Sequence, residues 1–233
     1  MSRIEEWITL GVRGKYICVT NVHSVIEARN RPSFKAVLDS ADLCVPDGMP
    51  LVWLGRLSGH VLKRRVYGPD LMLEFFRSTS MKGYKHFFYG GAAETLEKLV
   101  KELRKLFPSI EIVGSYSPPF RILSPQEDGS VVEMINKAAP DVLWVGLGCP
   151  KQESWMNEHR DRLNARVLLG VGQAFAIHAR QAVQAPFWLR EHGFEWLFRL
   201  LVEPRRLWKR YLVYNSQFLC LLFLEVFKLK RFE

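Results

Sequence analysis

Residues 141–163 read DVLWVGLGCPKQESWMNEHRDRL, and they combine a short apolar run, a tight turn and a helical pattern. The apolar run is continuous rather than alternating, which is typical of a parallel strand covered on both faces. The turn between the two glycines leads at once into residues that read as a helix. The stretch therefore predicts one strand–loop–helix unit of an α/β fold.

The same order of run, loop and helix recurs along the chain. It begins with KYICVT, ADLCV, KHFFY and ARVLLGV, each followed by small or polar residues and then a helical pattern. Strands that alternate with helices indicate a parallel sheet with right-handed crossovers. We expect an α/β, Rossmann-like fold with a mostly parallel sheet, helices on both faces and a C-terminal amphipathic helical appendage. The expected domains are a core at 1–193 and the appendage at 194–233.

Charge and composition narrow the class of partner. The 233 residues are 48% hydrophobic and carry a formal net charge of +9, which favours nucleic acid, an anionic membrane surface or phosphorylated substrates. The four cysteines are scattered, as expected of free thiols in a reducing compartment. We expect no signal peptide, because the start, MSRIEEWITL, lacks an apolar core, and no run reaches the ~20 apolar residues of a membrane span.

Ligands of parallel sheets bind at the carboxyl ends of the strands, so the strand-end loops carry the candidate site. The Gly90-Gly91 turn precedes a helix whose amides can hold a phosphate, or the glycines serve backbone geometry alone. Asp47, between Pro46 and Gly48, suits a general base or a helix N-cap. An arginine such as Arg65 can grip phosphate or lie on a solvated surface.

The sequence favours chemistry without a metal or other cofactor. It contains no Asp-x-Asp motif, and its six histidines are too scattered to suggest ligands. We expect arginine, lysine and helix N-termini to meet phosphate charge instead.

The C-terminal residues predict an amphipathic helix that begins at Pro204. Its basic first turns and aromatic rings are typical of a helix in a membrane interface, and the alternative is a helix packed on its own domain or another subunit. Its apolar stripe consists of Leu207, Tyr211, Tyr214, Phe218, Leu221 and Leu222.

Six stretches together resemble the WecG/TagA/CpsF family of bacterial glycosyltransferases (glycosyltransferase family 26). They are VTNVHSV, SADLCVPDGMPLVW, RRVYGPDLM, FYGGAAE, VGLGCPKQESWM and GFEWLFRLLVEPRRLWKRY, in order from about residue 17 to 212. The resemblance implies an inverting, metal-independent enzyme that moves a sugar from a UDP-sugar to a polyprenyl-pyrophosphate-linked saccharide in cell-surface or exopolysaccharide synthesis. It implies peripheral attachment to the anionic cytoplasmic face of the bacterial inner membrane, which fits the apolar stripe better than nucleic acid does. A homo-oligomer is left open.

The resemblance also assigns residues. Asp47 matches the family's catalytic aspartate, and Thr20 and Gln152 match two further catalytic positions. The implied substrate-binding residues are Asn21, Arg65, Gly90, Gly91, Gly148, Lys151, Arg199, Arg206 and Arg210.

One region departs from the family pattern. Ala176 stands where the family commonly has an aspartate, in GVGQAFAIHARQAVQAP. This departure leaves a second hypothesis open, in which the chain is a non-catalytic, membrane-bound subunit that binds nucleotide sugar or scaffolds other transferases. The sequence does not choose between an N-acetylmannosamine-type donor and a hexose.

Overall fold

The structure is a computed structural model that describes residues 1–226, and it divides into two compact units. The sheet unit contains residues 1–19, 37–45 and 66–183, and the pocket unit contains residues 20–36, 46–65 and those from 184 onward. The expected division into 1–193 and 194–233 stays a prediction. The observed units differ from it because two early segments pack with the C-terminal helices.

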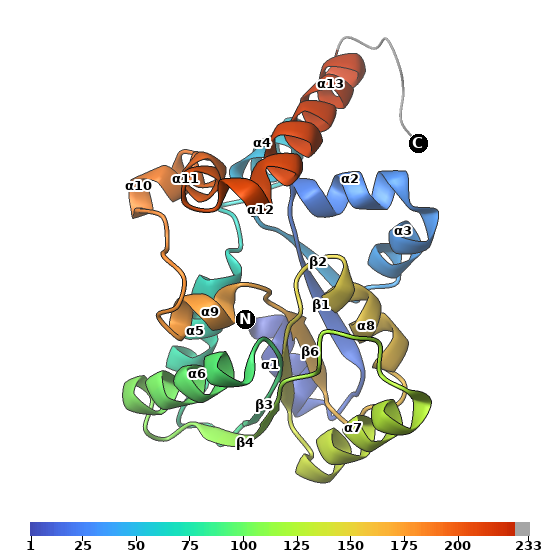
Figure 1. Cartoon of the computed structure of the whole chain (residues 1–233), viewed down its shortest axis with the longest axis vertical. Coiled ribbons are helices and arrows are strands. Elements are labelled where there is room, and N and C mark those ends of the chain that lie inside the picture. The colour runs from blue at the N-terminus through green and yellow to red at the C-terminus, as the bar shows by residue number, and fades with distance from the viewer. Residues whose placement is uncertain (227–233) are drawn as a thin grey trace. The chain divides into compact units, whose positions relative to one another are not determined.

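The sheet unit is built on six strands, in the order β2-β1-β6-β5-β3-β4. The pairs β1–β6, β6–β5, β5–β3 and β3–β4 are all parallel, so the predicted Rossmann-like α/β class is confirmed (Figure 1). The strands are β1 (Lys15–Thr20), β2 (Leu43–Pro46), β3 (Lys85–Gly90), β4 (Glu111–Tyr116), β5 (Val142–Gly146) and β6 (Val167–Gly170).

Alternate residues of the central strands enter two separate cores. In β5, Trp144 packs with α1, α5, α6 and α9, whereas Leu143 and Val145 pack with α7 and α8 on the opposite face. Both faces are apolar because both are covered, which accounts for the continuous apolar runs in the sequence. The helices of this unit are α1 (Ser2–Thr9), α5 (Gly68–Thr79), α6 (Ala93–Leu106), α7 (Pro125–Ala138), α8 (Lys151–His159) and α9 (Ala174–His178).

The chain passes between the units where two neighbouring strands end. Strand β1 ends at Thr20 and β2 ends at Pro46, and both residues belong to the pocket unit. The helices that follow are α2 (Val22–Asn30) and α4 (Met49–Leu57); α3 (Pro32–Asp39) is divided between the units. The C-terminal helices are α10 (Phe187–Glu191), α11 (Glu195–Val202), α12 (Pro204–Trp208), the π-helix η1 (Lys209–Val213) and α13 (Tyr214–Val226).

The C-terminal apolar stripe packs within the pocket unit, where half of its residues are buried and the rest partly buried. Phe218 packs against Val22 and Ile26 of α2, and Tyr214, Leu221 and Leu222 surround this contact. Leu207 and Tyr211 are buried as well. The stripe therefore packs on the chain itself, as the alternative of a helix packed on its own domain predicted, and attachment of the chain to a membrane stays a prediction.

The predicted helix start at Pro204 is confirmed. Across the described residues, no helix is both long and apolar enough to cross a membrane. The basic residues Lys228, Lys230 and Arg231, which the sequence offers as a second membrane contact, lie outside the described residues.

Candidate active site

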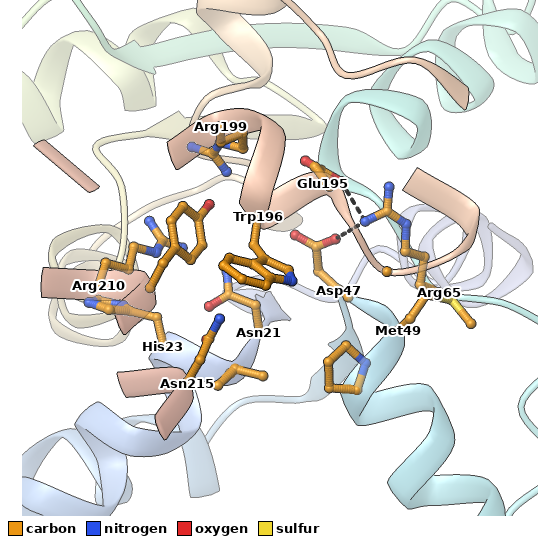
Figure 2. A pocket seen from close by; sticks show the side chains of 15 residues that line it. Asn21, His23, Asp47, Met49, Arg65, Glu195, Trp196, Arg199, Arg210 and Asn215 are labelled. Atoms are coloured by element: carbon orange, nitrogen blue, oxygen red, sulfur yellow. Dashed lines mark hydrogen bonds and ion pairs between the residues drawn. The ribbon is translucent and has the colours of Figure 1, made fainter. Parts of the chain in front are cut away.

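Asp47 is fixed by its own backbone at the end of β2. Its N–H donates to the carbonyl of Thr20 at 2.6 Å, so the ends of β1 and β2 are joined next to the carboxylate. Gly48, with φ +107°, provides the N-cap position of α4, and no side chain caps that helix. The N-cap alternative for Asp47 is therefore not realised, and its carboxylate faces a pocket instead (Figure 2).

The carboxylate of Asp47 shares an arginine with a second acid. The Nη1 atom of Arg65 lies 2.6 Å from Glu195 Oε2 and 3.8 Å from Asp47 Oδ1. Arg64 is exposed, whereas Arg65 is buried. Arg65 is thus not on the solvated surface, and its predicted role in binding phosphate stays a prediction.

Burial raises the pKa of Asp47 to about 7, and the nearby charge of Glu195 acts in the same direction. The positive charges of Arg65, Arg199 and Arg210 oppose this shift. A carboxyl group with this pKa binds and releases a proton near neutral pH, which is the property that a general base requires.

The C-terminal helices supply two more arginines to the same pocket. Arg199 lies one helical turn after Glu195 on α11, and Arg210 lies in the π-helical turn η1 (Figure 2). Among the described residues, the Nε atoms of both arginines are buried and have no hydrogen-bond partner. Both arginines line the pocket, and their positive charge suits an anionic ligand such as a diphosphate.

Polar and aromatic side chains complete the wall. Asn21 caps α2 by accepting from the N–H of Ser24, and it lines the pocket beside His23 and Trp196. Burial lowers the pKa of His23 to about 4, and the charge of Arg210 acts in the same direction, so its imidazole is neutral at pH 7. The pocket therefore offers neutral hydrogen-bonding groups as well as charge.

Two of the predicted pocket-unit residues are placed differently from this group. Thr20 contributes its backbone carbonyl to Asp47 and is not among the residues that line the pocket. Arg206 is largely exposed and makes two hydrogen bonds to Glu203, at 2.6 and 2.8 Å. Their predicted roles stay predictions.

Gln152 lies in the sheet unit and is buried in the turn that it follows. Its Oε1 accepts from the N–H of Gly148 at 3.1 Å, and its Nε2 donates to Glu153 at 2.9 Å. These two bonds fix the Gly146–Glu153 turn onto the start of α8. The catalytic role that the resemblance implies for Gln152 remains untested beside this positioning role.

The remaining predicted residues of the sheet unit sit at strand ends. Gly90 adopts φ +115°, and a Cβ there would lie 2.7 Å from the backbone of Gly146, so close strand packing explains this glycine. Gly91 and Gly148 also have positive φ, and Lys151 is exposed at the start of α8. The phosphate-binding role of this group stays a prediction.

The sequence reasoning missed several pocket residues. Glu195 is the most consequential of them, and its only sequence signal is the four-residue spacing to Arg199, which puts both on one face of α11. Further polar and aromatic ones include His23, Trp196, Tyr211 and Asn215. Within the described part of the chain, no group of three or more His, Cys, Asp or Glu residues could hold a metal ion.

The chain is similar to a known protein family and to several curated proteins. The model of the glycosyl transferase WecG/TagA/CpsF family matches residues 1–232. The similar curated proteins include three N-acetylglucosaminyldiphosphoundecaprenol N-acetyl-beta-D-mannosaminyltransferases. That of Bacillus spizizenii is 33% identical, over 86% of this chain and 76% of its own length. The Bacillus subtilis enzyme is 30% identical over 85% and 75%, and the Staphylococcus aureus enzyme is 28% identical over 84% and 73%.

Proposed function

Because this chain belongs to the WecG/TagA/CpsF family and is a glycosyltransferase, we propose that it moves a sugar from a UDP-linked donor to a saccharide carried on a polyprenyl diphosphate. The relatives named above transfer N-acetylmannosaminyl groups to N-acetylglucosaminyldiphosphoundecaprenol. UDP-N-acetylmannosamine and this lipid-linked acceptor are therefore the first pair of substrates to test.

One observation carries the proposal. A single pocket holds a carboxyl group, that of Asp47, whose pKa is about 7, and two arginines whose buried Nε atoms have no hydrogen-bond partner within the described chain. Glycosyl transfer from a sugar diphosphate needs both: a base for the attacking hydroxyl and positive charge for the departing phosphate.

The proposed reaction is a single displacement. Asp47 accepts the proton of an acceptor hydroxyl while that oxygen bonds to the anomeric carbon of the donor. The bond from the anomeric carbon to the phosphate oxygen breaks on the opposite face, so the configuration inverts and UDP leaves. Arg199 and Arg210 stabilise a diphosphate in the pocket, either that of the donor or that of the lipid carrier. We propose that these fixed charges take the place of a divalent cation.

We also propose that the enzyme binds the membrane peripherally, at the surface that carries its lipid-linked acceptor. The outer face of the C-terminal helices supports this, because it bears the exposed apolar side chains of Trp208, Leu212, Leu219 and Phe223, next to the exposed cations Arg205 and Lys209. Apolar and basic residues at helical spacing favour an anionic lipid interface. We propose the cytoplasmic face of the inner membrane as its location, since a UDP-sugar donor is a cytoplasmic metabolite.

The test is a panel of UDP-sugars incubated with the purified full-length chain and an N-acetylglucosaminyl-diphospholipid acceptor. Mass spectrometry should show the acceptor gaining one sugar residue, and the product should form equally well in excess EDTA. Loss of the product in EDTA, with recovery on adding Mg²⁺ or Mn²⁺, would contradict metal independence. Binding of UDP-sugars without any product across the panel would favour a non-catalytic subunit, the alternative that Ala176 raises.

A further inference from the structure

Arg65 stands between two carboxylates and is closer to the one that the proposed reaction does not use. Its Nη1 lies 2.6 Å from Glu195 and 3.8 Å from Asp47. All three side chains are largely buried, with exposed fractions of 6% for Arg65, 12% for Glu195 and 21% for Asp47. A charge-assisted hydrogen bond forms at the shorter distance, whereas 3.8 Å leaves only a weaker ion pair.

The consequence for Asp47 follows from simple electrostatics. An arginine in direct contact with a carboxylate occupies its oxygen and weakens it as a base. We propose that Glu195 is a positioning residue, which holds Arg65 away from direct contact with Asp47 and so keeps the Asp47 carboxylate available to the acceptor hydroxyl. This inference rests on the proposed role of Asp47 as the base.

The charges around Asp47 make Glu195 hard to replace. Arg65, Arg199 and Arg210 all act on Asp47 from different elements, and Tyr211 lies within electrostatic range as well. Of the described residues that line the pocket, Glu195 is the sole carboxylate besides Asp47. Without it, three cations would face one carboxylate, and Arg65 would be free to move onto it.

The position of Glu195 also links the base to the C-terminal helices. Glu195 is the first residue of α11, and Asp47 directly follows β2, far earlier in the sequence. The charges around Asp47 therefore depend on the packing of α11 next to it. This link assigns a second task to a segment that also delivers Arg199 and Arg210 to the pocket.

The test is the dependence of kcat and kcat/KM on pH, from about pH 5 to 9, in the full-length Glu195→Gln variant. Activity requires unprotonated Asp47, so the acidic limb should move to lower pH by about one unit or more when Arg65 pairs directly with Asp47. The plateau in kcat should fall roughly tenfold, because a weaker base removes the proton less well. KM should change little. Glu191→Gln, on α10, is the matched control, and its profile should equal that of the wild type.

The outcomes distinguish a positioning role of Glu195 from a purely structural one. An acidic limb that stays in place, with or without a lower melting temperature, would overturn the inference and leave Glu195 a structural residue. Glu195→Asp, which lengthens the distance to Arg65 by one methylene, serves if the Gln variant does not fold; a smaller shift in the same direction supports the inference, and no shift overturns it. Asp47→Asn is measured alongside. Normal turnover in that variant would refute the role of Asp47 as the base, on which this inference rests, while the glycosyl transfer itself stands. Absence of product from the wild-type chain would instead refute the proposed function.

Discussion

The carboxylate of Asp47 is poorly solvated, and this raises its pKa into the range of a general base. We expect Asp47→Asn to lower turnover by about two decades or more, the range usual for loss of a general base, because an amide cannot accept the proton. Affinity for UDP should change little, since the arginines of the pocket remain. Steady-state rates and UDP binding by calorimetry measure the two quantities. Turnover within a few-fold of the wild type would remove Asp47 from the mechanism.

The same carboxylate should lower the stability of the fold at neutral and alkaline pH. Its pKa is raised from an ordinary value of 3.8 to about 7 in the folded chain, so between these pH values the folded state binds a proton that the unfolded state has released. The contribution of Asp47 to the free energy of unfolding therefore falls as the pH rises from about 4 to 7, and it stays reduced above pH 7.

Asp47→Asn removes this penalty. The melting temperature of Asp47→Asn minus that of the wild type should be larger at pH 8 than at pH 5. The increase should be about 2–4 °C for each kcal/mol of unfolding free energy recovered. Differential scanning calorimetry at several pH values tests this, with the exposed Asp161→Asn as a control whose difference stays constant. A difference in melting temperature that is the same at pH 5 and pH 8 would contradict the raised pKa.

The candidate site was only partly predictable at the scale of single residues. The sequence itself shows that Asp47 and Asn21 follow predicted strands and that Arg65 belongs to a pair of arginines. The partner of Arg65, in contrast, is 130 residues away in the chain. Nothing local to Glu195 indicates that pairing, because it depends on where α11 packs. Gln152 shows the opposite case, a residue whose motif suggests chemistry and whose contacts fix a turn.

Among the elements, α13 is held by its contact with α2. Phe218 is 7% exposed and packs on Val22 and Ile26. Phe218→Ala should lower the free energy of unfolding by about 3–5 kcal/mol, the usual effect of truncating a buried phenylalanine. Its neighbour Leu219 is 62% exposed, so Leu219→Ala should change it by about 0.5 kcal/mol or less. Urea titrations compare the two variants, and equal effects would show that the helix does not pack as described.

The exposed face of the same helices makes a separate prediction. Replacing Leu219 and Phe223 by serine should reduce binding to anionic vesicles roughly tenfold or more, since two large apolar side chains no longer enter the interface. Met81→Ser removes an even more exposed apolar side chain from the sheet unit and should leave binding unchanged. Vesicle flotation with and without high salt measures both variants. Undiminished flotation of the double variant would exclude this face as the membrane contact.

The elements that the sequence predicted best are the buried ones. Five of the six strands follow continuous apolar runs. Helices cover both faces of β1, β3, β5 and β6, whereas the edge strand β2 is partly exposed. Strand β4 was missed because it lies at the edge of the sheet, where Gly114 and Ser115 interrupt the apolar pattern. The packing of the stripe on α2 through Phe218 could not be predicted either, because an amphipathic helix does not reveal from sequence whether its apolar face meets lipid or protein.

For the whole molecule, the division into two units predicts how the chain responds to loss of its C-terminus. The sheet unit has both of its cores within residues 1–183, whereas the pocket unit takes Phe218 into its only described hydrophobic cluster. The sheet unit should therefore keep its fold when residues 204–233 are deleted. The pocket unit should lose Arg210, Tyr211 and the cover over α2.

We expect the deleted chain to retain a cooperative thermal transition and strand content by circular dichroism, while segments 20–36 and 46–65 become sensitive to limited proteolysis. Catalysis should fall to background, because Arg210 leaves the pocket and the cover of α2 is lost. Release from anionic vesicles should accompany these changes, since the exposed apolar face is removed. Phe218→Ala is the matched comparison, because it weakens the same contact and keeps the exposed face. If the deleted chain floats with vesicles as well as the intact protein does, the C-terminal helices are not the anchor; if it unfolds without any cooperative transition, the sheet unit depends on them for its fold.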